Sequence, residues 1–158
     1  EHITPHVVEP SLGIDRALYT VLDHCYREDE VDGDERTYLE LPAAVAPTTV
    51  GVFPLMDRDG LGECAGELAD ELRAAGLSVA YDDSGAIGRR YRRQDEVGTP
   101  FCVTVDYATL GESEDGEGDP DTVTLRERDS TAQTRVHVDD LVETVEALRD
   151  GDIDFEDV

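Results

Sequence analysis

The sequence predicts an α/β domain, because short apolar runs alternate with segments of helical periodicity. Three apolar runs suit buried strands, and the two segments between them repeat their apolar residues at helical spacing. In chain order these five segments are 50–55, 61–75, 77–81, 87–97 and 101–107. Gly76 and Gly98 stand where each helix would end. Such a β-α-β-α-β alternation implies a layered sheet with right-handed crossovers.

Two further strands and one helix are predicted after this alternation. Residues 111–121 form an acidic, glycine-rich loop, and residues 122–126 and 134–138 are typical of a hairpin-like strand pair. Asp139 is a suitable N-cap for a last helix that runs to about Arg149. The domain is therefore predicted to hold about five strands flanked by three helices.

The first 46 residues follow a different pattern. The apolar pair Val7 and Val8 indicates a short strand, and a break at Pro10 and Ser11 precedes a helix. That helix would gather its apolar residues on one face: Ile14, Leu18, Val21, Leu22 and Cys25. We therefore expect a strand-helix segment (1–26), a polar linker (27–46), the main domain (47–150) and a flexible acidic tail (151–158).

The composition indicates adaptation to high salt. The chain has 158 residues and a formal charge of −26, and all thirteen of its basic residues are arginine. Hydrated carboxylates keep a protein soluble in concentrated salt; an acidic interaction protein is the alternative interpretation. No apolar stretch approaches the roughly twenty residues of a membrane span, and no signal peptide is visible. We expect a cytoplasmic protein with no membrane partner.

The cysteines and histidines predict no metal site. Cys25, Cys64 and Cys102 are odd in number and far apart, without a Cys-x-x-Cys pair. We therefore expect buried free thiols. The four histidines have no convincing ligand partners, and no nucleophile stands with a base.

Four of the thirteen arginines lie within five positions of the predicted helix 87–97: Arg89, Arg90, Arg92 and Arg93. This helix begins at the carboxyl end of the second strand, where ligands of α/β sheets gather and where the helix dipole favours anions. The planar guanidinium group also bonds phosphates and base edges in a bidentate way. We predict a polyanion site here. The alternative is an ion network with neighbouring acids: Asp82, Asp83, Asp95 and Glu96.

High salt favours one kind of nucleic-acid site over another. Because molar salt weakens counterion release, bidentate hydrogen bonds and stacking must carry recognition. This favours arginines combined with aromatic rings, for which the candidates are Phe53, Tyr81 and Tyr91. Tyr91 also lies one turn beyond Ile87, so its spacing equally suits packing in the core.

Three segments of the sequence resemble one family. Glu9 to Arg16 resembles motif 3 of class II aminoacyl-tRNA synthetases in its glycine-specific form. Tyr81 to Phe101 resembles the signature of the anticodon-binding domain that follows the catalytic domain, and Val123 to Arg135 resembles a later strand region of that domain. The chain is thus similar to the C-terminal part of the glycyl-tRNA synthetases, with a composition that suggests a halophilic archaeon.

The resemblance implies a fold and a set of roles. The fold would be a mixed sheet with flanking helices, preceded by a remnant of the catalytic domain. Arg16 would bind the ATP phosphates, and Glu9 and Ser11 would line the glycine pocket. The arginine cluster at 89–93 would contact the anticodon of tRNA(Gly), not DNA. The parent enzyme would be a homodimer that uses ATP with Mg²⁺, and the anticodon domain would bind no cofactor.

Two alternatives remain open at this point. Histidyl-, prolyl- and threonyl-tRNA synthetases share this domain, and Glu9-Pro10-Ser11 favours the glycine enzyme among them. A non-enzymatic adaptor that kept the fold is the second alternative, against which Arg16 argues. In either case we expect that these residues alone do not aminoacylate tRNA.

Overall fold

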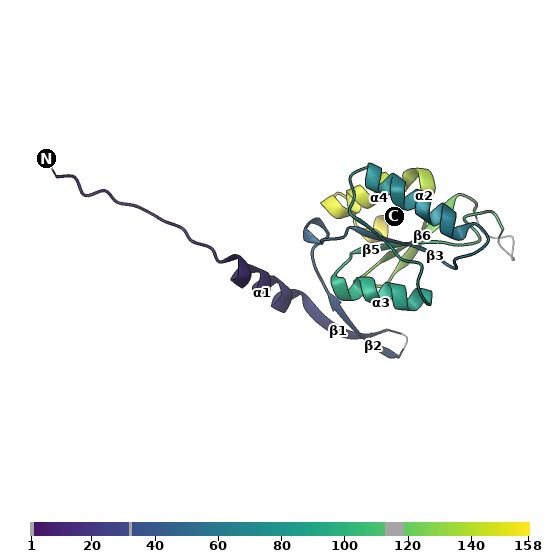
Figure 1. Ribbon diagram of the computed structural model, residues 1–158, viewed down its shortest axis with the longest axis horizontal. Helices are drawn as coiled ribbons and strands as arrows, with labels where there is room; N and C mark the ends of the chain where they lie inside the picture. Colours follow the sequence, from purple (N-terminus) through teal and green to yellow (C-terminus); the bar gives the residue numbers. More distant parts are fainter. Residues whose placement is uncertain (1, 32, 113–118) are drawn as a thin grey trace.

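The computed structural model describes residues 2–31, 33–112 and 119–158 and centres on a five-stranded mixed sheet (Figure 1). The strands are β3 (Val50–Pro54), β4 (Val79–Tyr81), β5 (Phe101–Val105), β6 (Thr122–Glu127) and β7 (Gln133–His137). Their order in the sheet is β4-β3-β5-β6-β7. Strand β3 pairs in parallel with β4 and β5, whereas β6 pairs antiparallel with β5 and β7. The predicted α/β class and the five strands are confirmed.

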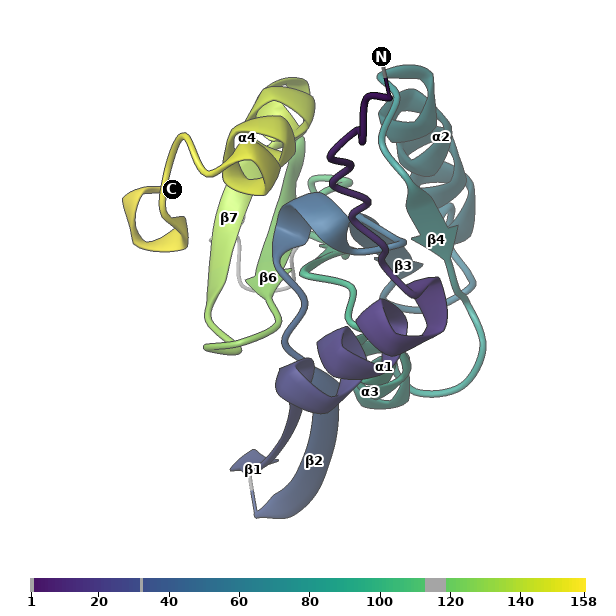
Figure 2. The same ribbon diagram turned by 90° about the vertical axis from the view of Figure 1, so that its left-hand side faces the viewer.

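Three helices flank the sheet, as predicted. They are α2 (Leu61–Ala74), α3 (Ile87–Val97) and α4 (Val138–Asp150). Helices α2 and α4 lie on one face of the sheet and α3 lies on the other (Figures 1 and 2). The apolar core fills the α2 and α4 side, because side chains at alternate strand positions point there. These strand residues are Val50, Val52, Phe101, Val103, Val105, Val123, Leu125 and Val136.

The α3 side of the sheet is more polar and includes the intervening strand positions. There the Tyr91 ring packs edge-on against Phe53, with ring centroids 5.6 Å apart, and its hydroxyl lies 2.6 Å from that of Thr104. Gly51 allows this close approach, since a Cβ atom at that position would lie 2.8 Å from the Phe53 ring. The contact of Tyr91 with Phe53 and Thr104 thus fixes α3 against strands β3 and β5.

The N-terminal segment is confirmed as a helix but not as a strand. Helix α1 (Ile14–Cys25) forms where the apolar periodicity predicts it, yet none of its residues is buried. The strand expected around Val7 and Val8 is wrong: residues 2–13 contain neither helix nor strand. Figure 1 shows this segment extending away from the domain. Without another strand or a core to pack against, two valines do not form sheet structure.

The segment expected to be a linker contains a β-hairpin. Strands β1 (Tyr26–Val31) and β2 (Asp34–Leu39) pair antiparallel and are followed by a short 3-10 turn, η1 (Ala43–Val45). The hairpin was not predicted because its inward residues are not simple aliphatic ones. Arg36 and Tyr38 alternate with exposed neighbours and are buried, and the Arg36 guanidinium stacks 4.2 Å from the Tyr38 ring centroid.

The C-terminal part departs from the prediction in detail. Helix α4 begins at Val138, and its N-cap is His137, whose Nδ1 accepts a hydrogen bond from the Asp139 amide at 3.2 Å. Asp139 is therefore not the cap. The tail is partly folded: a 3-10 turn, η2 (Phe155–Asp157), follows α4, and Ile153 and Phe155 pack against the core. Within the predicted acidic loop 111–121, residues 113–118 lie outside the described part.

No helix in the described ranges has both the length and the apolar character needed to cross a bilayer. The three cysteines are free; Cys102 is buried as expected, whereas Cys25 and Cys64 are half-buried. Burial raises the pKa of the Cys102 thiol to about 12, so this thiol is inert at neutral pH. Among the described residues no three His, Cys, Asp or Glu side chains gather as metal ligands.

Candidate nucleic-acid interface

The arginine cluster of α3 is divided by the helix into a buried and an exposed part. Successive helical residues turn by about 100°, so four arginines within five positions must face different sides. Arg90 is only 3% exposed, whereas Arg89 and Arg93 are exposed and Arg92 is half-buried. The sequence predicted the cluster; the packing of α3 decides which of its members reach solvent.

Arg90 is buried and bonded to the backbone, whereas the sequence led us to expect it at the surface facing RNA. Its guanidinium donates hydrogen bonds to the carbonyl oxygens of Pro54, Asp83 (2.7 Å) and Gly85 (2.8 Å). These bonds tie the loop before α3 to the end of β3. Among the described residues, the Arg90 Nε is a buried nitrogen without a hydrogen-bond partner. Its donors therefore face the protein interior.

Arg93 contacts the loop before α3 from its solvent-exposed side. Its guanidinium pairs with Asp82, with Nε at 2.8 Å, and donates to the Ser84 carbonyl oxygen at 2.8 Å. Partial burial favours the neutral form of Asp82, but hydrogen bonds from Ser84 and Arg93 outweigh it and lower the pKa of this carboxyl group. The ion network considered from the sequence is thus present for Arg93, and it leaves this exposed guanidinium partly engaged.

Arg89 and Arg92 line a hollow of about 520 Å³, here called the arginine pocket. It lies between α3, the tip of the β1–β2 hairpin and the β6–β7 turn. Its lining residues are Val31, Asp34, Ala86, Gly88, Arg89, Tyr91, Arg92, Arg126, Thr131 and Gln133. Arg89 forms no ion pair within the described ranges. Two arginines of the predicted cluster therefore share this pocket with residues from four strands, β1, β2, β6 and β7.

One wall of the arginine pocket is a stacked pair. The Arg126 guanidinium, from β6, lies 4.8 Å from the centroid of the Tyr91 ring. Burial raises the pKa of Tyr91, so its phenol stays neutral at physiological pH. Tyr91 packs on the sheet, as its spacing predicts for a core residue, and it also borders the pocket.

A buried carboxylate lies behind this wall. Asp95 is fully buried and forms a bidentate pair with Arg126, with nitrogen-oxygen distances of 2.9 and 3.1 Å. The same carboxylate lies 3.4 Å from Arg36 of the hairpin and 3.6 Å from Arg92 of its own helix. Three elements thus share one acid, here called the Asp95 cluster (Asp95, Arg36, Arg92 and Arg126).

Sequence reasoning did not assign Arg36 or Arg126 to the site. Arg126 alternates with apolar neighbours in its strand, as Val123 and Leu125 point into the core and Arg126 points to the α3 side. That alternation is the signal that could have found it. Arg36 lies in the segment taken as a linker, so no such signal was sought.

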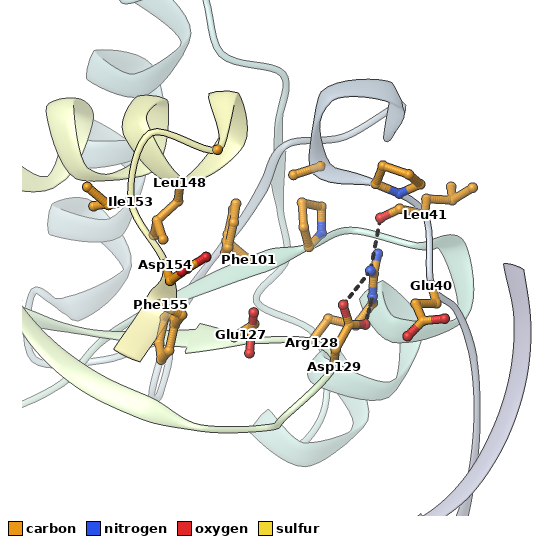
Figure 3. A pocket seen from close by; sticks show the side chains of 14 residues that line it. Glu40, Leu41, Phe101, Glu127, Arg128, Asp129, Leu148, Ile153, Asp154 and Phe155 are labelled. Carbon is orange, nitrogen blue, oxygen red and sulfur yellow. Dashed lines mark hydrogen bonds and ion pairs between the residues drawn. The ribbon is translucent and has the colours of Figure 1, made fainter. Parts of the chain in front are cut away.

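A second hollow, of about 420 Å³, differs in charge (Figure 3). It lies between η1, β5, β6 and the end of α4, and carries the carboxylates Glu40, Glu127, Asp129 and Asp154. Its one arginine, Arg128, is engaged by Asp129 at 2.7 Å and by the carbonyl oxygens of Gly98 (2.7 Å) and Leu41 (2.9 Å). This acid-rimmed hollow is unsuited to a polyanion.

The residues expected to bind glycine and ATP are not brought together. Glu9 and Ser11 lie in the irregular segment 2–13, and Arg16 lies on α1; all three are exposed. Arg16 forms no ion pair with any residue that the structure describes. One exposed guanidinium does not make a nucleotide site, so these residues as placed do not fit ATP and Mg²⁺.

The main domain matches a known protein family. A family model described as "Anticodon binding domain" matches residues 49–148, and the chain belongs to this family. The match covers the sheet with its three flanking helices.

Curated relatives extend the similarity to α1 and the hairpin. The chain is 48% identical over 155 residues to the glycine–tRNA ligase of Methanothrix thermoacetophila, which covers 98% of this chain and 26% of the relative. It is 51% identical over 142 residues to the glycine–tRNA ligase of Methanococcus maripaludis strain C5, and this match covers 90% of this chain and 23% of the relative. With the glycine–tRNA ligase of Archaeoglobus fulgidus it shares 47% identity over 146 residues, which cover 92% of this chain and 24% of the relative. The chain spans about a quarter of the length of these glycine–tRNA ligases.

Proposed function

We propose that this chain is the C-terminal part of a glycine–tRNA ligase and that its arginine pocket binds the anticodon of tRNA(Gly). The observation that carries the proposal is the pocket itself, in which Arg89 and Arg92 lie beside the stacked pair of Tyr91 and Arg126. Single-stranded RNA loops are recognised by stacking of unpaired bases and by hydrogen bonds to their edges. Membership in the anticodon-binding family and the glycine–tRNA ligase relatives support the same assignment.

The arginines take different roles in this proposal. Arg89 and Arg92 contact RNA, since both line the pocket and are the least engaged of the four arginines. Arg93 supports the loop before α3 and meets RNA only at the edge of the surface. Arg90, which we first expected to contact the anticodon, holds the helix in place instead.

The activity of the whole protein is part of the proposal. A glycine–tRNA ligase would join glycine to tRNA(Gly) with ATP and Mg²⁺. In the whole protein Arg16 would lie at the ATP phosphates and Glu9 and Ser11 at the glycine, where residues outside this chain would complete the sites that these three do not form here. The homodimer and the cytoplasmic location belong to the same proposal. The exposed apolar face of α1 supports the proposal that this chain is part of a larger protein, because such a face is suited to pack against a further domain.

The experiment is a binding measurement with the 158-residue chain in molar potassium chloride. An anticodon stem-loop with cytosines at the second and third anticodon positions is compared with one that carries uracils there. We expect the cytosine loop to bind at least about tenfold more tightly, since each well-read base is worth about 1–3 kcal/mol. Equal affinity for the two loops would rule out anticodon readout.

Substitutions locate the contact. Arg92→Ala and Arg89→Ala should each weaken binding by about 1–3 kcal/mol if they read base edges. Arg73→Ala is the matched control, because Arg73 is an exposed arginine that pairs with Asp70 on α2, across the sheet from α3. A loss of affinity with Arg73→Ala equal to that with Arg92→Ala would place the RNA elsewhere.

We also propose that the chain is adapted to high salt, which its charge of −26 supports. At molar salt the Debye length falls to about 3 Å, so repulsion among surface carboxylates is screened. The melting temperature should rise with potassium chloride. A melting temperature that does not change from dilute buffer to molar salt would contradict this.

A further inference from the structure

The Asp95 cluster combines burial and charge in a way that net stability does not explain by itself. Asp95 is fully buried on the inner side of α3, and its partners come from β2, α3 and β6. Buried ion pairs add little net stability in general, because desolvation opposes their attraction. A shared buried acid therefore calls for another explanation than stability, and its position directly behind the arginine pocket provides one.

The charges of the cluster do not cancel. Three guanidinium groups share two carboxylates, Asp95 and Asp29, the latter paired with Arg36 at 2.8 Å. These five groups together carry one net positive charge. The distances show where it resides, because Arg126 is held by two short bonds while Arg92 is 3.6 Å from Asp95 and 30% exposed. The excess charge is therefore presented to the pocket through Arg92.

We propose that Asp95 is a positioning residue for RNA binding, one that fixes Arg126 against Tyr91 and aims Arg92 into the arginine pocket. This inference rests on the proposed function. Without the carboxylate, Arg36, Arg92 and Arg126 would repel one another and the stacked wall would lose its anchor. Pre-orientation of long side chains lowers the entropy lost on binding, so a buried acid that touches no RNA still raises affinity.

Arg36 connects this arrangement to the hairpin. It donates to the Arg128 carbonyl oxygen at 2.6 Å as well as to Asp29, so the β1–β2 hairpin is held against the β6–β7 turn. Both segments border the arginine pocket. Asp95 joins this arrangement through its 3.4 Å contact with Arg36, so the acid contacts arginines from the hairpin, from β6 and from α3.

The test is a double-mutant cycle on the affinity for the cytosine stem-loop, with the full chain in molar salt. Arg92→Ala should weaken binding by about tenfold in the wild-type chain but by less than about twofold in the Asp95→Asn chain, since Arg92 is no longer aimed there. Asp95→Asn alone should weaken binding by about tenfold or more. If Arg92→Ala costs the same factor in both backgrounds, Asp95 is merely structural and the inference is wrong.

Two further variants guard against misfolding and against general charge effects. Arg126→Lys keeps the charge but cannot make the bidentate bond, so it should lower affinity several-fold without changing the salt dependence. Unchanged affinity would overturn the inference even if Asp95→Asn does not fold. Glu96→Gln removes the neighbouring exposed carboxylate of α3 and should leave affinity unchanged.

A measurement without RNA separates this inference from the proposed function. If the wild-type chain fails to bind the stem-loop, the proposed function falls. Positioning is then judged by NMR of the arginine guanidinium groups in the free chain. Asp95→Asn should abolish the slow proton exchange of the Arg126 Nη groups, and the retention of that slow exchange would refute the positioning role.

Discussion

Helices α1 and α3 are similar in length but opposite in what they bury. Helix α1, with 12 residues, leaves apolar side chains in solvent: Ile14 is 84% exposed and Leu18 58%. Helix α3, with 11 residues, buries charged ones, namely Arg90 and Asp95. The difference shows that the burial of a side chain depends on what its helix packs against. A charged group is buried where hydrogen-bonding and ionic partners surround it, and an apolar group stays exposed where no other element covers it.

The comparison also separates two kinds of interface. The face of α1 is apolar and lacks a partner among the described residues, as expected of a helix that packs against a further domain. The outer side of α3 is polar and borders the arginine pocket, as expected of a surface that binds RNA. Changes in the two helices should therefore affect different properties.

The largest expected effect comes from the buried acid. Asp95→Ala leaves Arg36 and Arg126 buried without their shared anion, which should lower the free energy of unfolding by about 3–5 kcal/mol. Chemical denaturation followed by circular dichroism measures this. Asp15→Ala, an acid in the first turn of α1, is the matched control and should change stability by less than about 0.5 kcal/mol. Similar losses of stability for both variants would contradict the difference in burial between α1 and α3.

The next effect concerns Arg90. Arg90→Ala removes three charge-assisted hydrogen bonds to backbone carbonyls and should destabilise the chain by about 1.5–3 kcal/mol. Arg89→Ala, its exposed neighbour, should stay within about 0.5 kcal/mol of the wild type while weakening RNA binding. Thermal and urea unfolding of both variants test the pair. A stable Arg90→Ala chain with impaired RNA binding would restore the prediction made from the sequence.

Two glycines of the α3 region should respond with opposite signs. At Gly98 the backbone has φ +83°, and a Cβ atom would lie 2.6 Å from the Leu41 side chain and 3.1 Å from the Leu39 carbonyl oxygen. Gly98→Ala should therefore cost at least about 1 kcal/mol. Gly88, inside α3, has no atom within 4 Å of such a Cβ, so Gly88→Ala should stabilise the helix by about 0.5–1 kcal/mol. Loss of stability in both variants would contradict the helix geometry.

The smallest effect is expected on α1. Leu18→Ser removes an exposed apolar side chain and should change the melting temperature of this chain very little, because nothing buried is lost. The same substitution in a whole glycine–tRNA ligase should be destabilising if the proposed domain packing is right. A marked loss of stability in the 158-residue chain would show that α1 packs onto the domain after all.

The sequence predicted the elements of the main domain well, because their signals are local. Short apolar runs defined β3 and β5, helical spacing defined α2, and Gly98 marked the end of α3. It also identified α1, although not its exposure. The β1–β2 hairpin was missed because its buried positions hold Arg36 and Tyr38, which carry no simple apolar pattern.

The candidate site was predicted only in part for a related reason. The arginine cluster is visible in the chain, but the roles of its members depend on contacts across long separations. Arg90 meets Pro54 and Arg126 meets Asp95, pairs that lie 36 and 31 residues apart. No local pattern reveals which of several arginines faces a carbonyl oxygen and which faces solvent.

The sequence by itself determined the α/β class, the arginine-rich helix and the family resemblance, since periodicity, composition and motifs are properties of neighbouring residues. Only the tertiary structure decided that Arg90 is buried, that Arg89 and Arg92 share a pocket with Arg126, and that Asp95 lies behind it. The physical reason is that burial and ion pairing depend on the distances between distant segments, and those distances exist only once the sheet, α3 and the hairpin are packed together.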